Sequence, residues 1–425
     1  MSEETRPLTH NIDRSRGPLD LRGYERAGGY QGLRRALQLG PKGVAEEVKN
    51  ARLRGRGGAG FPTAQKWSFM PDPEKAPGPR YLVCNADEME PGTFKDRLLL
   101  EGDPHQLVEG MAVAACALQV PVAYIFLRWA YAPAEEALRR AIAEAHEGGY
   151  LGPNVLGSGF SLELHLHTSA GRYICGEESA LLNALEGKRP VPRAKPPFPQ
   201  TSGLWGRPTV VQNAETLCNL PHILTRGAAW YTGLGKGRDA GTKIYGVSGR
   251  VQRPGAWELP MGTPLGEVLE HAGGMHPGLT FRGALPGGGS TSFVTEQHLG
   301  VAMDFESLQE AGSRLGTGTM IVLDDQTCPV GMVRNLEHFF AQESCGWCTP
   351  CREGLPWTEK ALVALESGRG TPQDLETLEW HTRLIDMGAT FCAHAPGAMA
   401  PLASAMRLFG EDFQRHVREQ RCPWS

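Results

Sequence analysis

The sequence predicts a multidomain protein in which an α/β region, a small α+β module and an all-α region follow one another. Strand patterns alternate with helix patterns through the first half, which indicates a mostly parallel sheet surrounded by helices. Short strands with one helix follow, and helix patterns dominate after Pro329. A chain of 425 residues is long enough for about two to four domains. We place an N-terminal segment at 1–54, the α/β domain at 55–228, the α+β module at 240–326 and the helical bundle at 329–425.

The α/β region is predicted from start, stop and periodicity signals. Asp103 precedes a proline at the first helical position, and Gln106 can reach back to the cap, so a helix begins there. Leucines alternate with polar residues over 161–167, which is the period of a strand. The full expectation is helices at 32–39, 104–118, 134–146 and 177–185, with strands at 81–85, 122–128 and 161–167.

The second half is predicted in the same way. The α+β module has strand candidates at 243–250, 255–258, 280–284 and 319–323, with one helix at 264–272. The C-terminal region has helices at 332–342, 352–366, 375–387 and 399–417. Four helices of this length can form a bundle around a shared core.

Charge and apolar content argue against several function classes. Lys and Arg number 43 and Asp and Glu number 47, and the resulting net charge of −4 does not suggest a nucleic-acid-binding protein. The longest apolar run, 111–127, is interrupted by Gln119 and Pro121 and is shorter than the ~20 residues of a membrane-spanning helix. A buried helix followed by a buried strand explains it better. Residues 1–4 have neither a basic nor an apolar stretch, so we expect no secretory signal.

Three of the ten cysteines are the sharpest functional signal. Cys345, Cys348 and Cys351 are separated by two residues each, and three thiolates on a tight loop can hold one face of a cubane iron–sulfur cluster. The fourth thiolate would come from Cys392 or Cys422. The alternatives are a zinc site, which usually presents two separated pairs, and thiols that only fill space. The spacing favours a reduced protein over a disulfide scaffold.

A glycine-rich loop is the second signal. Residues 55–60 match the dinucleotide fingerprint, but the polar stretch before them does not predict the strand that a Rossmann site needs. A backbone nearly free of Cβ atoms can still approach a phosphate closely. Positive charge or flat rings for stacking would come from Arg54, Arg56, Lys66, Phe61, Trp67 and Phe69. The alternative is an ordinary surface loop followed by core aromatics.

Two acidic clusters follow predicted strands. Asp87, Glu88 and Glu90 come after the first strand, and Glu177 and Glu178 begin a helix after the third. Ligands of α/β sheets bind at the carboxyl ends of strands, where such groups can bind ribitol, ribose or a carboxamide. Carboxylates at a helix start can also serve the helix dipole alone. The proline-rich segment 195–199 is rigid and extended, or simply a linker.

Five motifs in one order resemble those of a known family. They are GRGGAGFPT at 55–63, NADEMEPGT at 85–93, ICGEE at 174–178, KPPFP at 195–199 and ESCGWCTPCR at 343–352. From about Gly29 to about Phe413 the chain resembles the NADH-oxidising flavoprotein component of bacterial respiratory complex I, the F subunit of NADH-quinone oxidoreductase. The resemblance implies a modified Rossmann-like flavin domain, a ubiquitin-like (SLBB-type) module and a four-helix bundle that holds a 4Fe–4S cluster.

The resemblance also implies cofactors and the residues that bind them. NADH would give a hydride to FMN, and single electrons would pass to the cluster and on to quinone through other subunits. The matching FMN positions are Gly55, Gly57, Gly58, Lys66, Asn85, Asp87, Glu88, Tyr173, Gly176, Glu177, Glu178, Asn213 and Thr216. The NADH positions are Gly55, Arg56, Gly57, Gly58, Ala59, Gly60, Phe61, Lys66, Phe69, Glu90, Glu178, Lys195 and Phe198. The cluster ligands are Cys345, Cys348, Cys351 and Cys392. Glu90 and Glu178 would position the nicotinamide and flavin, with no obligate acid–base residue.

The implied partners are a small thioredoxin-like 2Fe–2S subunit and a large multi-cluster subunit of the peripheral arm. The chain would contact the membrane only through the complex, on the cytoplasmic side of the bacterial inner membrane. An alternative is the diaphorase subunit of a soluble NAD-linked hydrogenase or formate dehydrogenase, which shares these motifs. A third possibility is an electron carrier or zinc scaffold without catalysis.

Three positions depart from the family pattern. Ala64 and Ser169 stand where relatives commonly carry glycine, and their added Cβ atoms are harmless only where φ is negative. Gln212 stands where asparagine is common, next to an expected flavin contact.

Overall fold

The computed structural model describes residues 5–13 and 15–424, so the expectation of no secretory signal at residues 1–4 lies outside the described residues. The chain folds into two compact units. The first comprises Met1–Met89, Phe94–Ile244 and Glu258–Gly262, and the second comprises Glu90–Thr93, Tyr245–Trp257 and Thr263–Ser425.

A four-stranded sheet forms the centre of the first unit. Its strands are β1 (Tyr81–Ala86), β2 (Val122–Leu127), β3 (Glu163–Thr168) and β4 (Thr209–Asn213). The order is β3-β2-β1-β4 and each neighbouring pair is parallel, which confirms the predicted parallel sheet. This order is the beginning of the doubly wound arrangement, and its direction reverses between β1 and β4. Ligands of such sheets bind outside the carboxyl ends of the strands at the reversal.

The strand β4 is not predicted from the sequence. The strand is only five residues long and ends in the polar Gln212 and Asn213, so it lacks a clear strand period. Parallel pairing with β1 holds it in the sheet, and its first four residues are buried. Contacts within the sheet therefore decide its conformation where the local pattern does not.

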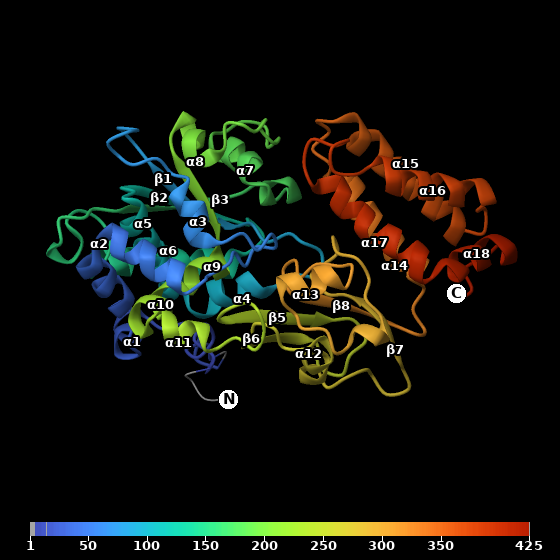
Figure 1. The fold of residues 1–425 in the computed structure, drawn as a ribbon, viewed down its shortest axis with the longest axis horizontal. Helices are drawn as coiled ribbons and strands as arrows, with labels where there is room; N and C mark the ends of the chain where they lie inside the picture. Colours follow the sequence, from blue (N-terminus) through green and yellow to red (C-terminus); the bar gives the residue numbers. More distant parts are fainter. Residues whose placement is uncertain (1–4, 14, 425) are drawn as a thin grey trace. The chain divides into compact units, whose positions relative to one another are not determined.

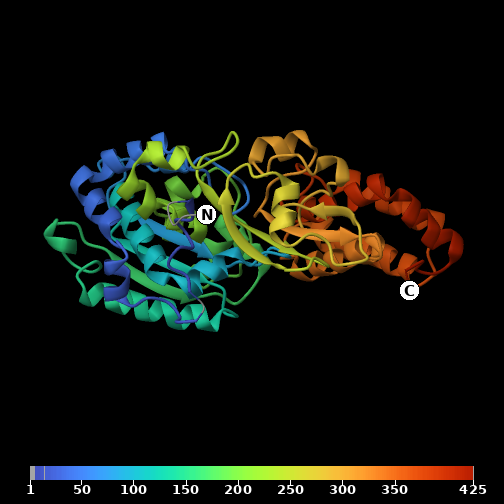
Figure 2. The ribbon, with the colours of Figure 1, turned by 90° about the horizontal axis from the view of Figure 1, so that it is seen from below.

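Helices surround this sheet (Figures 1 and 2). They are α1 (Leu21–Arg26), α2 (Gln31–Asn50), α3 (Thr63–Ser68), α4 (Lys95–Gly102), α5 (Pro104–Leu118), α6 (Ala132–Glu147), α7 (Glu178–Leu185), α8 (Pro199–Ser202), α9 (Ala214–Cys218), α10 (Leu220–Arg226) and α11 (Ala228–Thr232), with short turns η2 (Val155–Gly157), η3 (Tyr173–Gly176) and η4 (Leu204–Gly206). The predicted helix at 32–39 is confirmed, because the helical backbone breaks at Gly40, where a φ of 70° suits glycine. A second helical stretch, which is not predicted, continues α2 from this kink to Asn50.

Helices cover both faces of the sheet. On one face, Val83, Phe126 and Val211 pack in a cluster with Leu181 and Leu182 of α7. Because successive side chains of a strand point to opposite faces, their neighbours face the other way, where α5 packs on β1 and β2. The apolar run at 111–127 is the end of the buried α5 followed by β2, as predicted.

The second unit contains most of a mixed sheet in the order β6-β5-β8-β7. The strands are β5 (Thr242–Ser248), β6 (Gly255–Pro260), β7 (Phe281–Leu285) and β8 (Thr319–Asp324). β5 pairs with β8 in parallel and β7 pairs with β8 antiparallel. These strands and α12 (Leu265–His271) match the predicted α+β module, whereas α13 (Phe305–Glu310) and η5 (Glu296–His298) are not predicted.

Five helices end the described part of the chain: α14 (Pro329–Glu343), α15 (Thr349–Glu366), α16 (Pro372–Leu384), α17 (His394–Leu408) and α18 (Gly410–Glu419). α14 to α17 pack against one another as in a bundle. The prediction of one helix over 399–417 is wrong, because the backbone at Phe409 leaves the helical region. The Phe409 ring packs edge-on against Phe293 with centroids 5.4 Å apart, and the next residue is a glycine, a weak helix former.

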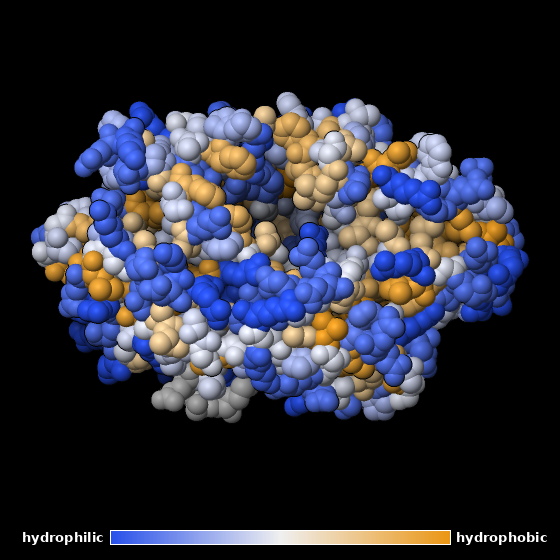
Figure 3. Space-filling view, viewed as in Figure 1, coloured by the Kyte–Doolittle hydropathy of each residue, from blue (hydrophilic) through white to orange (hydrophobic). Residues whose placement is uncertain are grey.

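Within residues 5–13 and 15–424, no helix has both the length and the apolar character to cross a membrane. The apolar helix α5 has 15 residues, fewer than the ~20 that span a bilayer. The face drawn in Figure 3 mixes hydrophilic and hydrophobic residues.

Candidate functional site

A pocket of about 400 Å³ lies at the sheet reversal of the first unit. Asn85 near the end of β1 and Asn213 at the end of β4 both line it, and the two are paired directly across the strands. The other lining residues are Gly55, Gly57, Ala59, Gly60, Phe61, Lys66, Phe69, Gly176, Glu178, Phe198, Gln200, Val211, Gln212 and Thr216. The structure thus brings together many of the residues that the sequence analysis assigns to FMN and NADH.

The glycine loop presents bare backbone to the pocket. The Gly55 N–H donates to the Phe61 carbonyl at 2.9 Å, which closes the loop on itself. Gly57 lies so near Asn213 that a Cβ atom added to it would be 3.0 Å from the Asn213 Cβ. In the described chain the helix α2 precedes the loop. The prediction that no Rossmann strand leads into the loop is therefore confirmed. Exposed N–H groups in such a loop suit the binding of a phosphate.

The Cβ atoms of Ala64 and Ser169 cause no backbone strain. Neither residue has a positive φ in the described chain. Ala64 lies in α3, and the Ser169 N–H donates to the Leu127 carbonyl at 2.7 Å. The Cβ atoms that these two residues have in place of glycine are therefore harmless to the backbone.

Of the three cations near the loop, only Lys66 lines the pocket. Arg56 is fully buried, and its guanidinium donates to the Tyr231 hydroxyl at 3.0 Å and to two backbone carbonyls. Arg54 forms an ion pair with Asp239 at 3.1 Å. Both arginine side chains hold the loop by internal contacts instead of adding charge to the pocket, which corrects that expectation.

Two lysines and two carboxylates form a charged cluster beside the pocket. Lys66 Nζ lies 2.8 Å from Glu178 Oε2, and Lys195 Nζ lies 2.8 Å from Glu177 Oε1 and 3.3 Å from Glu178 Oε1. Burial opposes the charged form of Glu178, but the two lysines outweigh it and hold its pKa below the ordinary value. Glu177 also caps α7, accepting from the Ser179 N–H at 3.0 Å. The helix-start interpretation therefore applies to Glu177, while Glu178 faces the pocket.

Three aromatic rings of the lining are unusually exposed for their size. Phe61, Phe69 and Phe198 retain 43%, 50% and 53% of their accessible surface, and the Phe61 and Phe69 centroids are 6.0 Å apart. Exposed rings gathered at a pocket suit a flat, apolar ligand group. Trp67 is buried, so for this ring the core interpretation holds.

In the acidic cluster after β1, the carboxylate of Glu88 has a structural role. Its carboxylate accepts from the N–H groups of Lys95, Asp96 and Arg97 at 3.0, 2.9 and 3.2 Å, which caps the start of α4. Burial, followed by the neighbouring Asp96, raises the Glu88 pKa to about 7. This carboxylate is satisfied within the protein.

Glu90 belongs to the second unit, where its Oε1 accepts from the Ser290 N–H at 2.7 Å. The residues assigned to FMN or NADH that do not line the pocket are Arg56, Gly58, Asp87, Glu88, Glu90, Tyr173, Glu177 and Lys195. Lys195 and Glu177 adjoin it through Glu178. The roles of all these residues as ligand contacts stay predictions.

Three lining residues, Gln200, Val211 and Gln212, are absent from the predicted site. Recognising β4 beside β1 would have found the last two, because both then end at the same edge of the sheet. Gln212 Oε1 is buried and accepts no hydrogen bond from the described residues, although its Nε2 lies 3.4 Å from Thr63 Oγ1. A buried acceptor in a pocket lining fits a ligand that brings an N–H group.

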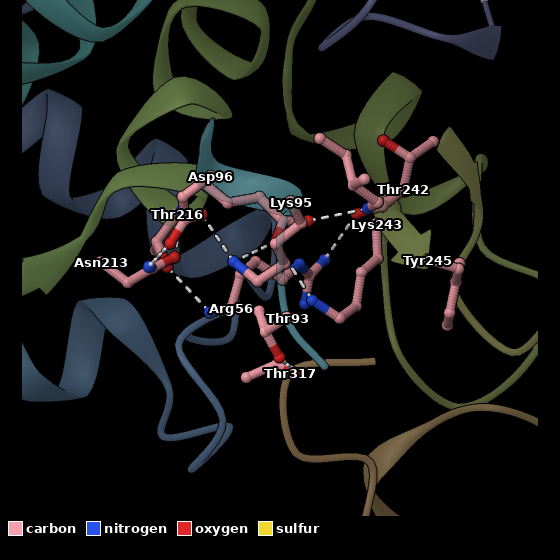
Figure 4. A network of polar contacts seen from close by, with 12 residues as sticks. Arg56, Thr93, Lys95, Asp96, Asn213, Thr216, Thr242, Lys243, Tyr245 and Thr317 are labelled. Carbon is pink, nitrogen blue, oxygen red and sulfur yellow. Dashed lines mark hydrogen bonds and ion pairs between the residues drawn. The ribbon is translucent and has the colours of Figure 1, made fainter. Parts of the chain in front are cut away.

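A buried ion network holds the lining in place (Figure 4). Lys95 Nζ lies 2.6 Å from Asp96 Oδ1 and 2.8 Å from Glu215 Oε2, and Lys243 Nζ lies 3.1 Å from Glu215 Oε2. Asn213 Nδ2 donates to Asp96 Oδ2 at 2.7 Å, which connects the network to the pocket. Burial opposes the Glu215 charge, but the two lysines lower its pKa to about 2. The network therefore stays charged and fixes the end of β4.

The four cysteines assigned to the cluster come together in the second unit. Cys345 and Cys348 precede α15, Cys351 lies in its first turn, and Cys392 precedes α17. Burial and then the three neighbouring thiols raise the Cys351 pKa to about 12. Ser344 Oγ lies 3.1 Å from Cys351 Sγ. Four thiols from two segments are the donor set that a cubane cluster takes.

The remaining cysteines behave differently. None of the ten cysteines, all of them described, forms a disulfide, as expected for a reduced protein. Cys422, the other candidate for the fourth ligand, lies within 4.8 Å of Cys328 and His416. Cys84, Cys116, Cys175 and Cys218 are buried, in keeping with small core residues.

Parts of the chain match models of known protein families. Three family models match, described as the Nuo51 FMN-binding domain at residues 48–222, the SLBB domain at 244–294 and the NADH-ubiquinone oxidoreductase-F iron-sulfur binding region at 331–416. The chain is also similar to a crystal structure of an NAD+-reducing NiFe hydrogenase in the H2-reduced state, with a TM-score of 0.80 and 35% identity. That match covers 93% of this chain and 65% of the hydrogenase chain.

Curated relatives match over nearly the full length. The F subunit of NADH-quinone oxidoreductase from Salmonella typhimurium is 57% identical over 418 residues, which is 98% of this chain and 94% of the relative. An F subunit of the same enzyme from Rhizobium meliloti is 52% identical over 420 residues, 98% of this chain and 99% of the relative. The Mycobacterium bovis F subunit is 45% identical over 403 residues, 94% and 90% of the two chains. The chain therefore belongs to the family of NADH-quinone oxidoreductase F subunits.

Proposed function

We propose that the pocket of the first unit binds FMN and NADH together, and that the cysteine group of the second unit holds the 4Fe–4S cluster. The chain is an oxidoreductase component of the NADH-quinone oxidoreductase family, with an FMN-binding domain and an iron–sulfur region. The observation that carries the pocket assignment is its composition. A bare glycine backbone, a charged Lys66–Glu178 pair and three exposed rings meet at the sheet reversal.

The residues present fit FMN. Backbone N–H groups of the glycine loop suit its phosphate, and the polar ends of Asn85 and Asn213 suit the ribityl hydroxyls. Gln212 offers a buried acceptor for a ring N–H. We therefore assign FMN to this part of the pocket, with Gln212 as a contact in spite of its departure from the family pattern.

The residues also fit NADH. Phe61, Phe69 and Phe198 present flat faces for an adenine ring. Glu178, held charged by Lys66, is placed to accept from ribose or carboxamide groups. These side chains bind and orient the nucleotide and exclude water from it, and none needs to transfer a proton. When bound, FMN accepts a hydride and the cluster carries single electrons.

The wider assembly follows from the family. The chain is one component of a multi-subunit complex by its relatives' names. We propose that its neighbours are a small thioredoxin-like 2Fe–2S subunit and a large multi-cluster subunit, on the cytoplasmic side of the bacterial inner membrane. The rival assignment is the diaphorase subunit of a soluble hydrogenase, which the structural likeness supports at 35% identity. The 57% identity to an F subunit of NADH-quinone oxidoreductase favours the first assignment.

The test is an anaerobic titration of the full chain, co-expressed with its proposed small partner, first with NADPH and then with NADH. We expect NADH to bleach the flavin absorption and to reduce a cubane signal in low-temperature EPR spectra. Protein that carries no flavin, or flavin that NADH leaves oxidised, would contradict the pocket assignment.

A further inference from the structure

A second group of metal-ligand side chains lies in the second unit, separate from the four cysteines of the cluster. Cys328, His416 and Cys422 bring one ligand atom each to within 4.8 Å of the others. Cys328 Sγ and His416 Nε2 are 3.5 Å apart. In a tetrahedral zinc site with bonds of about 2.3 Å to sulfur and about 2.0 Å to nitrogen, neighbouring ligand atoms are about 3.5–3.8 Å apart. Cys328 and His416 therefore have the spacing of two ligands around one ion, and the Cys422 ligand atom lies within 4.8 Å of both.

The histidine is oriented for coordination. His416 Nδ1 lies 2.7 Å from the Asp412 carbonyl oxygen, which can only accept, so Nδ1 carries the proton. In the neutral ring Nε2 then has a lone pair, and it faces the Cys328 sulfur. A backbone carbonyl on the far nitrogen is the usual support of a metal-binding histidine. His416 is fully buried, so its ring is also fixed by packing.

The sulfur of Cys328 also has a hydrogen-bond partner from the backbone. Cys328 is the N-cap of α14, and the Gly331 N–H donates to its Sγ at 3.3 Å. Burial raises the pKa of the Cys328 thiol to about 12, while this N–H group at the helix start acts in the opposite direction and favours a negatively charged sulfur. The Trp424 ring stacks on His416 with a centroid distance of 6.1 Å and an interplanar angle of 16°. This ring contact links α18 to the segment that carries Cys422.

We propose that Cys328, His416 and Cys422 bind a zinc-class divalent ion, with the fourth position taken by water or by an outside group. Both thiols lose their protons on binding, so two thiolates neutralise the double charge of the ion. The ion would join the start of α14 to the segment after α18, which is a structural role.

The test measures zinc in the intact, cluster-loaded full chain after exposure to Zn²⁺ and exhaustive dialysis. We expect about one zinc per chain, and a zinc K-edge absorption spectrum with two sulfur neighbours at about 2.3 Å and a nitrogen at about 2.0 Å. Iron content and the EPR signal should not change, because the four cluster cysteines are different residues. This readout is independent of NADH oxidation.

Variants test whether zinc is bound by these residues and not by other thiols of the chain. Cys422→Ser and the double change Cys328→Ser with Cys422→Ser should lose the bound zinc, whereas the control Cys116→Ser, a buried thiol of the first unit, should keep it. Cys422 is only partly buried, so the single variant should fold, and circular dichroism checks this. The proposal fails if folded wild type retains no zinc, if zinc persists in the double variant, or if mass spectrometry shows a Cys328–Cys422 disulfide in place of the metal.

Discussion

The pocket of the first unit and the cysteine group of the second are built on opposite principles. The pocket is fixed by contacts within the protein, such as the Lys95–Glu215 pair and the hydrogen bond from Asn213 to Asp96. The cysteine group is a set of thiols on loop and helix-start positions, and its natural partner is the cluster itself. The pocket should therefore survive loss of one contact residue, whereas the cluster should be lost when any one of its four ligands is removed.

The largest expected effect is at the cysteine group. Cys348→Ala removes one of four thiolates, so we expect the EPR signal of the cluster and onward electron transfer to disappear. NADH should still reduce the flavin, because the pocket belongs to the other unit. Stopped-flow absorption measures the reduction of the flavin by NADH, and EPR measures the cluster. Cys116→Ser is the control. An intact cluster signal would remove Cys348 from the ligand set.

The next effect is on the network that fixes the pocket. Glu215→Gln leaves Lys95 and Lys243 without their shared carboxylate, and breaking a buried pair in this way costs about 3–5 kcal/mol of unfolding free energy. Denaturant titration measures this loss. The control Glu135→Gln removes the half-buried partner of the exposed Arg139 and should cost less than about 1 kcal/mol.

The same variant has a pH signature. The Glu215 pKa is lowered to about 2 in the folded protein, so the carboxylate stabilises the fold above its ordinary pKa of 4.5. That contribution is lost as the pH falls from about 4.5 towards 2, and the gap between wild type and Glu215→Gln should narrow there. A gap that does not change with pH would show that the charge of Glu215 is not what stabilises the network.

A smaller effect is expected at the exposed rings. Phe198→Ala should raise the KM for NADH about tenfold, since a stacked ring can contribute about 1.4 kcal/mol beyond its buried area and that loss is a factor of ten. FMN retention should not change. Trp380→Ala, on an exposed ring of α16 outside the pocket lining, is the control. Equal loss of NADH and FMN binding would sink the assignment of Phe198 to NADH.

The smallest effect is expected from added volume in the lining. A Cβ on Gly176 would meet no protein atom within 4 Å, so Gly176→Ala should leave the unfolding free energy unchanged. Because Gly176 lines the pocket, its methyl group should weaken FMN binding about fivefold, or about 1 kcal/mol. Gly300→Ala, with equally open surroundings outside the lining, should alter neither quantity. Unchanged FMN affinity in Gly176→Ala would place the flavin elsewhere.

Motifs with fixed spacing could be predicted from the sequence, and contacts between distant segments could not. The helix that begins at Pro104 and the strand β3 are predicted from local signals, and both elements are present in the folded chain. β4 and the pocket residue Gln212 depend on pairing with β1, which no local pattern encodes. Arg56 has the charge expected of a phosphate contact, but its side chain is buried and its Nη2 donates to Tyr231 and to two backbone carbonyls, which no local pattern predicts.

The central claim is that one pocket binds both FMN and NADH, and a structure of the chain with both bound tests it most directly. We expect flavin density beside Asn85, Gly176 and Gln212, with the adenine of NADH against Phe198. Flavin or nucleotide density bound away from the β1–β4 reversal would contradict it.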